Sequence, residues 1–287
     1  MKLIEVNSAK WIKEFHHLPK EIYKNDPNWI PYIKQDIEKL FDSKKNKLFA
    51  EGAEAIRWIL SDDNGKHIGR VAAFINPKTT TTSSLKTGGM GFFECINDQN
   101  AANFLFDACL KWLKERGMEA MDGPINFGDR SEFWGCQITN FDEPAIYPMN
   151  YNLEYYKDLF ENYGFQNYFF QYNFWRDIHV PAQPIFHRKY NQLKNDPDFQ
   201  IMDIKGKNLD VVAEDFRTVY NGAWGGHAHF KPMSKEAARK IFKAMKPAID
   251  PEIVIFVFYK GEPVAFYLNL PELNQIFRHV NGIVRSN

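Results

Sequence analysis

The stretch Gly91-Phe-Phe-Glu-Cys-Ile-Asn-Asp-Gln-Asn-Ala-Ala-Asn-Phe-Leu-Phe-Asp-Ala-Cys-Leu-Lys-Trp-Leu-Lys-Glu-Arg-Gly117 decides how this chain folds. It opens with a strongly apolar run over 91–96, which predicts a buried strand near the centre of a sheet. A polar turn then leads into a helix that Gly117 ends as a C-cap. Met118–Met121 follows as a short strand. Strand, helix and strand in this order predict a parallel crossover.

The segments before this stretch predict a mixed sheet covered by helices. Ala55–Leu60 and His67–Ile75 are apolar runs joined by the polar turn Asp62–Lys66, whose Asn-Gly pair favours the backbone angles of a tight turn. They predict an antiparallel hairpin. Leu3–Val6 has a strand pattern, and helical spacing predicts two helices before the hairpin, the second over 33–41. The fold class is therefore α/β, an α+β mixed sheet with helices on both faces.

Beyond the crossover, the chain predicts one more helix and strand and then a partial repeat. Glu154–Tyr163 reads as a helix, and alternation in Phe165–Trp175 predicts a strand. From Phe199 the order strand, helix, helix, hairpin returns at an offset of about two hundred residues. We expect a first domain over 1–180 and a partial second domain over 198–287, which stops before a central strand of its own.

The composition argues against several kinds of partner. The 36 Lys and Arg residues balance the 36 Asp and Glu residues, so we expect no nucleic-acid partner and no membrane partner. Cys95, Cys109 and Cys136 are widely spaced and form no Cys-x-x-Cys pair, which disfavours disulfides and zinc sites. The N-terminus lacks a long apolar run, so we expect a cytoplasmic protein without a signal peptide or anchor.

A set of motifs around the opening stretch resembles the GNAT N-acetyltransferase superfamily. The motifs are Gly91-Phe92-Phe93-Glu94-Cys95, Trp112-Leu113, Gly117, Gly123-Pro124-Ile125-Asn126, Tyr151-Asn152, Tyr155-Tyr156, Leu159, Glu161 and Gly164-Phe165. The resemblance covers nearly the whole chain and is to a bacterial branch typically built from two tandem GNAT-like units. It implies a GNAT acyl-CoA N-acyltransferase fold with a partial second GNAT-like unit.

The same resemblance implies where an acyl-CoA binds. In such enzymes the central strand holds the pantetheine arm along its backbone, and the N-terminus of the next helix receives the pyrophosphate, because free amides and the helix dipole favour anions there. The co-substrate implied is acetyl-CoA or another acyl-CoA. The binding positions implied are Cys95, Ile96, Asn97, Asn100, Ala101 and Ala102.

The chain departs from the GNAT pattern at three points. The turn Asp98–Asn103 has no glycine to let a phosphate approach the backbone, and Asp98 favours a helix cap while repelling a pyrophosphate. Phe160 occupies the position, four residues before Gly164, where many GNAT enzymes carry the tyrosine that protonates the leaving thiolate. The second unit ends before a cofactor strand of its own. These departures weaken the catalytic inference and leave the fold inference intact.

Two residues are candidate catalytic groups. Glu94 lies inside an apolar run, where desolvation raises the pKa of a carboxyl toward the range of a general base. A place in a water-filled groove, or a structural ion pair, explains the same position equally well. Tyr156, beside Tyr155, is a candidate proton donor, although helical tyrosines more often serve packing.

Candidate substrate contacts follow the short strand. Asn126, Arg130 and Trp134 lie where GNAT substrates approach, but turn bonding and solvated loop charges are the plainer explanations. His227 and His229 have no cysteine or carboxylate nearby, so no metal site is predicted.

Two functional classes follow from these observations. The first is an N-acyltransferase that moves an acetyl or other acyl group from acyl-CoA to a small-molecule or peptide amine. The second is a non-catalytic GNAT-fold protein whose degenerate cofactor site binds a ligand or a partner. A transferase that uses aminoacyl-tRNA is disfavoured, because the charge is balanced and no basic stripe is evident.

Overall fold

The computed structural model describes residues 1–80, 85–128, 132–226 and 232–283. By contacts the chain divides into two units. One is Met1–Tyr172 with the segment from Leu273 onward, and the other is Asn173–Glu272. A GNAT-like domain over 1–180 and a partial second one over 198–287 are expected because one unit looks duplicated. The division into units by contacts does not test a duplication, so these domains stay a prediction.

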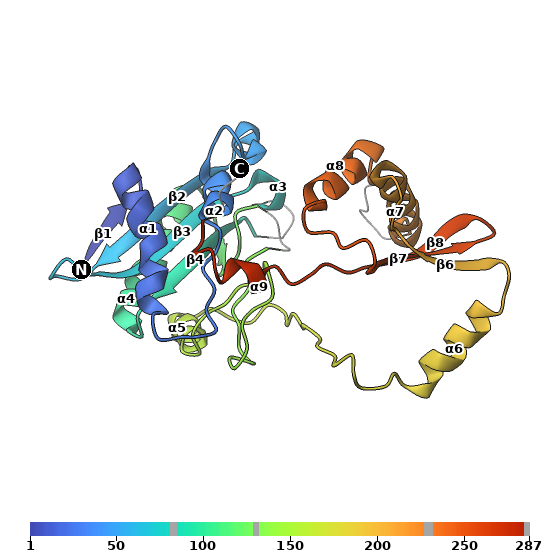
Figure 1. Cartoon of the computed structure of the whole chain (residues 1–287). Helices are drawn as coiled ribbons and strands as arrows, with labels where there is room; N and C mark the ends of the chain where they lie inside the picture. Colours follow the sequence, from blue (N-terminus) through green and yellow to red (C-terminus); the bar gives the residue numbers. More distant parts are fainter. Residues whose placement is uncertain (81–84, 129–131, 227–231, 284–287) are drawn as a thin grey trace. The chain divides into compact units, whose positions relative to one another are not determined.

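The first unit is built on a five-stranded mixed sheet (Figure 1). Its strands, in spatial order, are β1 (Lys2–Glu5), β2 (Glu54–Ser61), β3 (His67–Ile75), β4 (Thr87–Cys95) and β5 (Ala120–Asp122). Neighbours from β1 to β4 are antiparallel, whereas β4 and β5 are parallel. The predicted mixed α/β class is confirmed. The strand predicted over 91–96 is the second half of β4, which pairs with β3 alone, because β5 pairs only with residues 87–89 of β4.

Helices cover both faces of this sheet because successive side chains of a strand point to opposite sides. Val71 and Ala73 of β3 enter the core beside Leu105, whereas Arg70 faces Phe15. Figure 1 shows the helix that carries Phe15 lying over the sheet. The helical elements of the unit are α1 (Ala9–Ile22), α2 (Lys34–Phe41), the 3-10 helix Lys47–Glu51, α3 (Pro77–Thr80), α4 (Gln99–Lys114), α5 (Tyr156–Tyr163) and α9 (Asn274–Phe277).

Strand β4 is irregular where it borders the chain that follows β5. Phe92 and Phe93 together face one residue of β3, which makes a β-bulge, and Phe92 has a backbone φ of +52°. The β4–β5 pairing extends only from Thr87 to Gly89. Past a cis peptide bond at Gly123-Pro124, the Ile125 N–H donates one more backbone hydrogen bond, to the Met90 carbonyl. A pocket lies beside this part of the strand.

One predicted strand is wrong. Phe165–Trp175 has no regular secondary structure, and most of its side chains are exposed. Alternation of residues cannot produce a strand without a neighbour to satisfy its amides and carbonyls, and no described strand pairs with this segment. The helix before it is confirmed and ends at Gly164, whose φ is +113°.

The second unit has its own three-stranded antiparallel sheet and core. Its elements are α6 (Pro184–Lys194), β6 (Phe199–Asp203), α7 (Leu209–Trp224), α8 (Lys235–Met245), β7 (Val254–Tyr259) and β8 (Glu262–Leu268), with strand order β6-β7-β8. Buried side chains of α7, α8 and β7, among them Val212, Phe242 and Phe256, form the core. From β6 onward the element order equals that of β1, α1, α2, β2 and β3, as predicted. Descent from a duplicated unit stays a prediction.

None of the helices in the described ranges is both long enough and apolar enough to cross a membrane.

Candidate functional site

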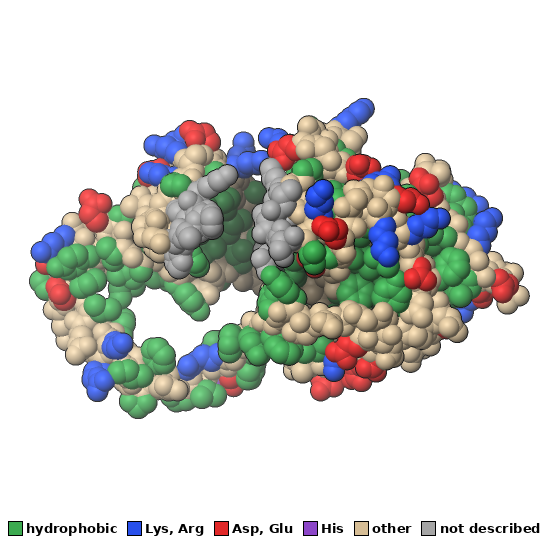
Figure 2. All heavy atoms as spheres, turned by 180° about the vertical axis from the view of Figure 1, so that it is seen from behind, with side chains coloured by type: hydrophobic (Ala, Val, Ile, Leu, Met, Phe, Trp, Pro, Cys, Tyr) green, Lys and Arg blue, Asp and Glu red, His purple; other side chains and the backbone are tan. Residues whose placement is uncertain are grey.

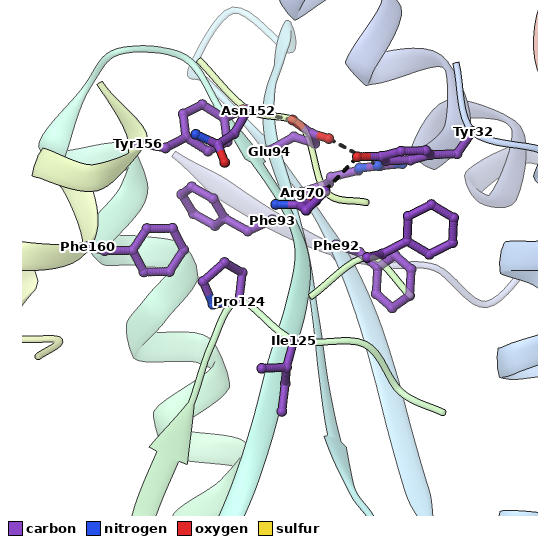
Figure 3. A pocket seen from close by; sticks show the side chains of 12 residues that line it. Tyr32, Arg70, Phe92, Phe93, Glu94, Pro124, Ile125, Asn152, Tyr156 and Phe160 are labelled. Carbon is purple, nitrogen blue, oxygen red and sulfur yellow. Dashed lines mark hydrogen bonds and ion pairs between the residues drawn. The ribbon is translucent and has the colours of Figure 1, made fainter. Parts of the chain in front are cut away.

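A pocket lies in the first unit between β4 and the chain that follows β5 (Figure 3). Its wall combines aromatic and aliphatic side chains with a small group of polar ones. The lining residues are Tyr32, Arg70, Phe92, Phe93, Glu94, Pro124, Ile125, Phe133, Asn150, Asn152, Tyr156 and Phe160. They come from the α1–α2 connection, β3, β4, the segments on either side of the loop around Phe133, and α5. A mostly apolar pocket with a few converging polar groups is the usual form of a ligand site.

Glu94 on β4 is the centre of the polar group. Its side chain is only 4% exposed. Its Oε2 accepts hydrogen bonds from the hydroxyls of Tyr23, at 2.7 Å, and Tyr156, at 2.8 Å. Its Oε1 lies 3.4 Å from a guanidinium nitrogen of Arg70. The structure therefore brings the two predicted catalytic residues into direct contact.

Two kinds of effect act on the pKa of Glu94 in opposite directions. Burial raises the pKa of this carboxyl above its ordinary value, while Arg70 and the hydrogen bonds from the two tyrosines oppose the rise. Burial and the nearby carboxylate raise the pKa of Tyr23 and of Tyr156 well above 10, so both hydroxyls stay protonated as donors. The result is a carboxyl that takes up a proton more readily than a solvated one and is held in a fixed orientation.

Arg70 reaches the pocket from β3 beneath Glu94. One guanidinium nitrogen donates to the carbonyl of Phe15 at 2.6 Å, and the group lies 4.5 Å from the centre of the Phe15 ring. Its Nε has no hydrogen-bond partner among the described residues. A buried arginine is costly unless it is paired, and here the carboxylate of Glu94 supplies the opposite charge.

The loop before α5 supplies amide groups to the same pocket. The Tyr32 hydroxyl donates to Asn150 Oδ1 at 3.2 Å and accepts from the backbone N–H of Tyr151 at 3.0 Å. Asn152 accepts from the Gln137 N–H at 2.7 Å and donates to the Gln137 carbonyl at 3.1 Å. These bonds hold the polar side of the pocket in one arrangement, which favours binding without reorganisation.

Sequence reasoning missed several of these residues. Arg70, Tyr23 and Tyr32 received no role, although a charged residue within the apolar run of β3 is the same signal that singled out Glu94. Asn152 entered only through the resemblance. No local pattern points to Tyr32, because its role depends on the distant loop that carries Asn150.

An acyl-CoA pyrophosphate is predicted to bind at the start of α4. The backbone amides there already have hydrogen-bond partners within the chain. Asp98 Oδ1 accepts from the amides of Asn100, at 2.8 Å, and Ala101, at 3.1 Å, which confirms the helix-cap interpretation. The Ala102 amide donates to the Asp98 carbonyl at 3.0 Å. Asn97 lies exposed just before the cap. A pyrophosphate at this helix end must therefore compete with the Asp98 carboxylate.

The predicted pantetheine positions on β4 are also engaged. The Cys95 N–H donates to the Tyr156 hydroxyl at 3.1 Å, and the Cys95 carbonyl accepts from the Tyr155 hydroxyl at 2.6 Å. The Ile96 N–H donates to the Ile68 carbonyl at 3.0 Å. A pantetheine arm on this part of the strand would have to replace the bonds to α5, so cofactor binding here stays a prediction.

Two of the predicted substrate contacts, Asn126 and Trp134, are next to pocket residues in the chain but do not line the pocket themselves. Asn126 is buried directly after the pocket residue Ile125, and neither polar atom of its side-chain amide has a partner among the described residues. Trp134 is half-buried next to the pocket residue Phe133. Arg130 lies outside the described residues.

The described ranges contain no cluster of three or more His, Cys, Asp or Glu side chains arranged to hold a metal ion. His227 and His229 lie outside those ranges, so their arrangement is not part of this finding.

The chain has relatives of low identity among known proteins and solved structures. No family model matches the chain. The chain is 25% identical to a bacterial ceramide synthase of Caulobacter vibrioides, over 98% of this chain and 73% of that protein. It is 24% identical to the protein YghO of Escherichia coli, over 94% of this chain and 68% of that protein. Among solved structures, the GCN5-related glucosamine N-acetyltransferase region of a fungal multi-domain β-N-acetylglucosaminidase is 13% identical and has a TM-score of 0.44; the match covers 93% of this chain and 27% of that one.

The resemblance to the GNAT acetyltransferases is carried by the sequence motifs of the first unit. The topology of that unit agrees with the resemblance, because an antiparallel meander is followed by a parallel crossover through α4.

Proposed function

We propose that this chain is an N-acyltransferase that transfers an acyl group from an acyl-CoA thioester to a primary amine. The observation that carries the proposal is Glu94, a buried carboxylate on the pocket wall that is hydrogen-bonded to two protonated tyrosines. A carboxyl with a raised pKa suits general-base work, because it takes up a proton more readily than a solvated carboxyl does.

The proposed reaction consumes one amine and one thioester. Glu94 accepts a proton from the amine nitrogen as that nitrogen bonds to the thioester carbonyl carbon, which gives a tetrahedral intermediate. When the intermediate collapses, its carbon–sulfur bond breaks and the thiolate takes a proton from the Tyr156 hydroxyl. The proton held by Glu94 returns to Tyr156 along their 2.8 Å hydrogen bond. The products are the N-acylated amine and free CoA thiol, and the enzyme regains its starting protonation state.

The apolar part of the pocket wall would lie beside the reacting end of the acyl group that is transferred. Phe92, Phe93 and Phe160 surround the space beside Glu94, with Ile125 on the opposite side (Figure 3). The relative from Caulobacter vibrioides is named for the synthesis of ceramide, a long-chain amide. We therefore propose a long-chain acyl-CoA as donor and a small-molecule amine with an apolar chain as acceptor.

The proposed position of the CoA pyrophosphate is the start of α4, which is the helix end nearest to the end of β4. Support comes from the resemblance and from the general affinity of helix N-termini for anions. The Asp98 cap opposes an anion there, so the proposed site binds CoA weakly.

A non-catalytic protein with a degenerate cofactor site is the second candidate. It is favoured by the hydrogen bonds that already occupy the backbone of Cys95 and the first amides of α4. Under this proposal the pocket holds a small ligand but no acyl-CoA.

A paired experiment separates the two proposals. Calorimetric titration measures binding of acetyl-CoA and a long-chain acyl-CoA, and a thiol assay follows CoA release with and without a long-chain amine. The acyltransferase proposal expects binding of both and amine-dependent release that prefers the long chain. If neither compound binds and no thiol is released, the non-catalytic proposal stands. Binding with release that ignores the amine would indicate thioester hydrolysis instead.

A further inference from the structure

Large apolar side chains are exposed along the segment Phe174–Lys194 of the second unit. Three of them protrude almost completely, with exposed fractions of 93% for Phe174, 87% for Trp175 and 86% for Ile178. The others on this segment are Val180, Phe186, Tyr190 and Leu193. A concentration of this kind within about twenty consecutive residues exceeds the scattered exposed apolar residues that any soluble protein carries.

The helix within this segment, α6, is amphipathic. Phe186, Tyr190 and Leu193 follow one another at spacings of four and three residues, so they share one face, and α6 has no buried residue. On a helix of 3.6 residues per turn, Lys189 and Lys194 fall on the two flanks of that face. Lysines in these positions can extend their ammonium groups sideways while the apolar face enters a less polar layer.

The segment is also locally basic within a chain of balanced charge. It contains Arg176, Arg188, Lys189 and Lys194 but only one acidic residue, Asp177. In the described part of the chain, none of these four basic side chains forms an ion pair. Figure 2 shows blue and green side chains next to one another along this segment, which is the thin run at the lower left.

We infer that Phe174–Lys194 binds the surface of an anionic lipid bilayer. The aromatic and aliphatic side chains would lie at the boundary between headgroups and acyl chains, with the lysines and arginines among the anionic headgroups. Tryptophan and phenylalanine beside a lysine-flanked amphipathic helix form the combination that such an interface favours. The balanced charge of the whole chain predicted no membrane partner, but this binding depends on local charge, which falls off within a Debye length. The inference does not depend on the proposed acyl transfer.

Vesicle co-sedimentation of the full chain tests the inference. Phosphatidylcholine vesicles are compared with vesicles that also contain phosphatidylglycerol, at low and high salt. We expect binding to the anionic vesicles that weakens as salt rises, and little binding to phosphatidylcholine alone. The double variant Lys189→Glu with Lys194→Glu should bind about tenfold more weakly or worse, and Phe174→Ser with Trp175→Ser should also lose binding. Because the changed side chains are exposed, each variant should fold, which circular dichroism checks.

Two controls from the same unit match these variants. Lys240→Glu with Lys243→Glu reverses two exposed charges on α8, and Val264→Ser with Tyr267→Ser removes two exposed apolar groups from β8. Both controls should bind anionic vesicles like the unchanged protein. Equal loss in controls and test variants would overturn the inference, as would binding that does not distinguish the two lipid compositions.

Two other occupants of the segment give different outcomes. If a second copy covers it, light scattering will show a dimer that Phe174→Ser with Trp175→Ser converts to a monomer. If another part of the protein covers it, hydrogen exchange will show the non-helical residues 174–183 protected in the absence of lipid. Either result would overturn the lipid assignment.

Discussion

The Tyr156 hydroxyl donates a 2.8 Å hydrogen bond to Glu94 Oε2 and accepts one from the Cys95 N–H. A single phenol therefore links the start of α5 to two consecutive residues of β4. The Tyr156 hydroxyl therefore connects the proposed base, Glu94, to the part of the strand where a thioester is expected. The roles of Glu94 and Tyr156 can both be tested by small substitutions.

Replacing Glu94 with Gln should lower kcat by about 10²- to 10⁴-fold, because the amide has nearly the same shape but cannot accept the amine proton. Steady-state release of CoA thiol with an amine acceptor measures the effect. Glu161→Gln on the exposed side of α5 is the matched control and should leave kcat unchanged. Activity of Glu94→Gln within about threefold of the original protein would exclude Glu94 as the base.

The pH dependence of kcat/KM should show an acidic limb that belongs to Glu94. The pKa of this carboxyl lies above its ordinary value of 4.5. The active form is the carboxylate, so the rate should fall as pH drops through that raised pKa and level off above it. Acceptor amines of different basicity distinguish the enzyme from the substrate. A limb that moves with the pKa of the amine reports the substrate, whereas the Glu94 limb should stay in place.

Replacing Tyr156 with Phe should reduce kcat by about tenfold to a hundredfold while the fold persists. The substitution removes the proposed thiolate donor and one of the two tyrosine hydrogen bonds to Glu94, and it leaves the Cys95 N–H without its partner. We expect a loss of unfolding free energy of about 1 to 2 kcal/mol. Tyr163→Phe is the control: this tyrosine lies at the other end of α5, its hydroxyl donates to the exposed Asp107 of α4, and its loss should change neither quantity. A Tyr156→Phe enzyme with full activity would show that another group protonates the thiolate.

Replacing Asp98 with Asn should tighten acetyl-CoA binding by about fivefold, since it removes a like charge worth on the order of 1 kcal/mol. Asn is also a good helix cap, so α4 should keep its stability. Calorimetric titration measures the Kd, and Glu115→Gln at the other end of α4 serves as control. Tight binding that ignores the Asp98 substitution would place the pyrophosphate elsewhere.

Replacing Glu38 with Gln should destabilise the first unit by about 1 to 3 kcal/mol at pH 7. Burial alone would raise the pKa of Glu38, but hydrogen bonds from His16 and Arg57 outweigh it and lower the pKa to about 2. A carboxyl whose pKa is lower in the folded state stabilises the fold above its ordinary pKa of 4.5. That contribution is lost as pH falls through about 2.

Urea unfolding at pH 7 and at pH 3 measures this effect. The difference between the original protein and Glu38→Gln should shrink at pH 3, where part of the contribution is gone. Glu21→Gln, which removes an exposed partner of His17, should have almost no effect at either pH. A difference that stays constant with pH would mean that the charge of Glu38 contributes nothing.

The features that the sequence predicted correctly depend on neighbouring residues. Apolar periodicity over 67–75 and 91–96 marks strands, and the hairpin turn lies between residues 61 and 67 as predicted. The cap at Asp98 and the helix end at Gly117, whose φ is +76°, follow from the same local rules. Glu94 stood out because a carboxylate inside an apolar run is costly wherever the run lies. All of these signals span a few residues, which is the range over which backbone preferences and helix or strand periods act.

The errors and omissions depend on distant parts of the chain. Phe165–Trp175 alternates like a strand, but a strand also needs a neighbour, and nothing within the segment says whether one exists. Glu94 acquires its partners from Tyr23, 71 residues earlier, and Tyr156, 62 residues later. Sequence alone thus determined most of the helices and strands and singled out Glu94 as a carboxylate within an apolar strand. Only the tertiary structure decided which groups surround that carboxylate, because contacts between distant residues arise from packing and leave no periodic trace in the chain.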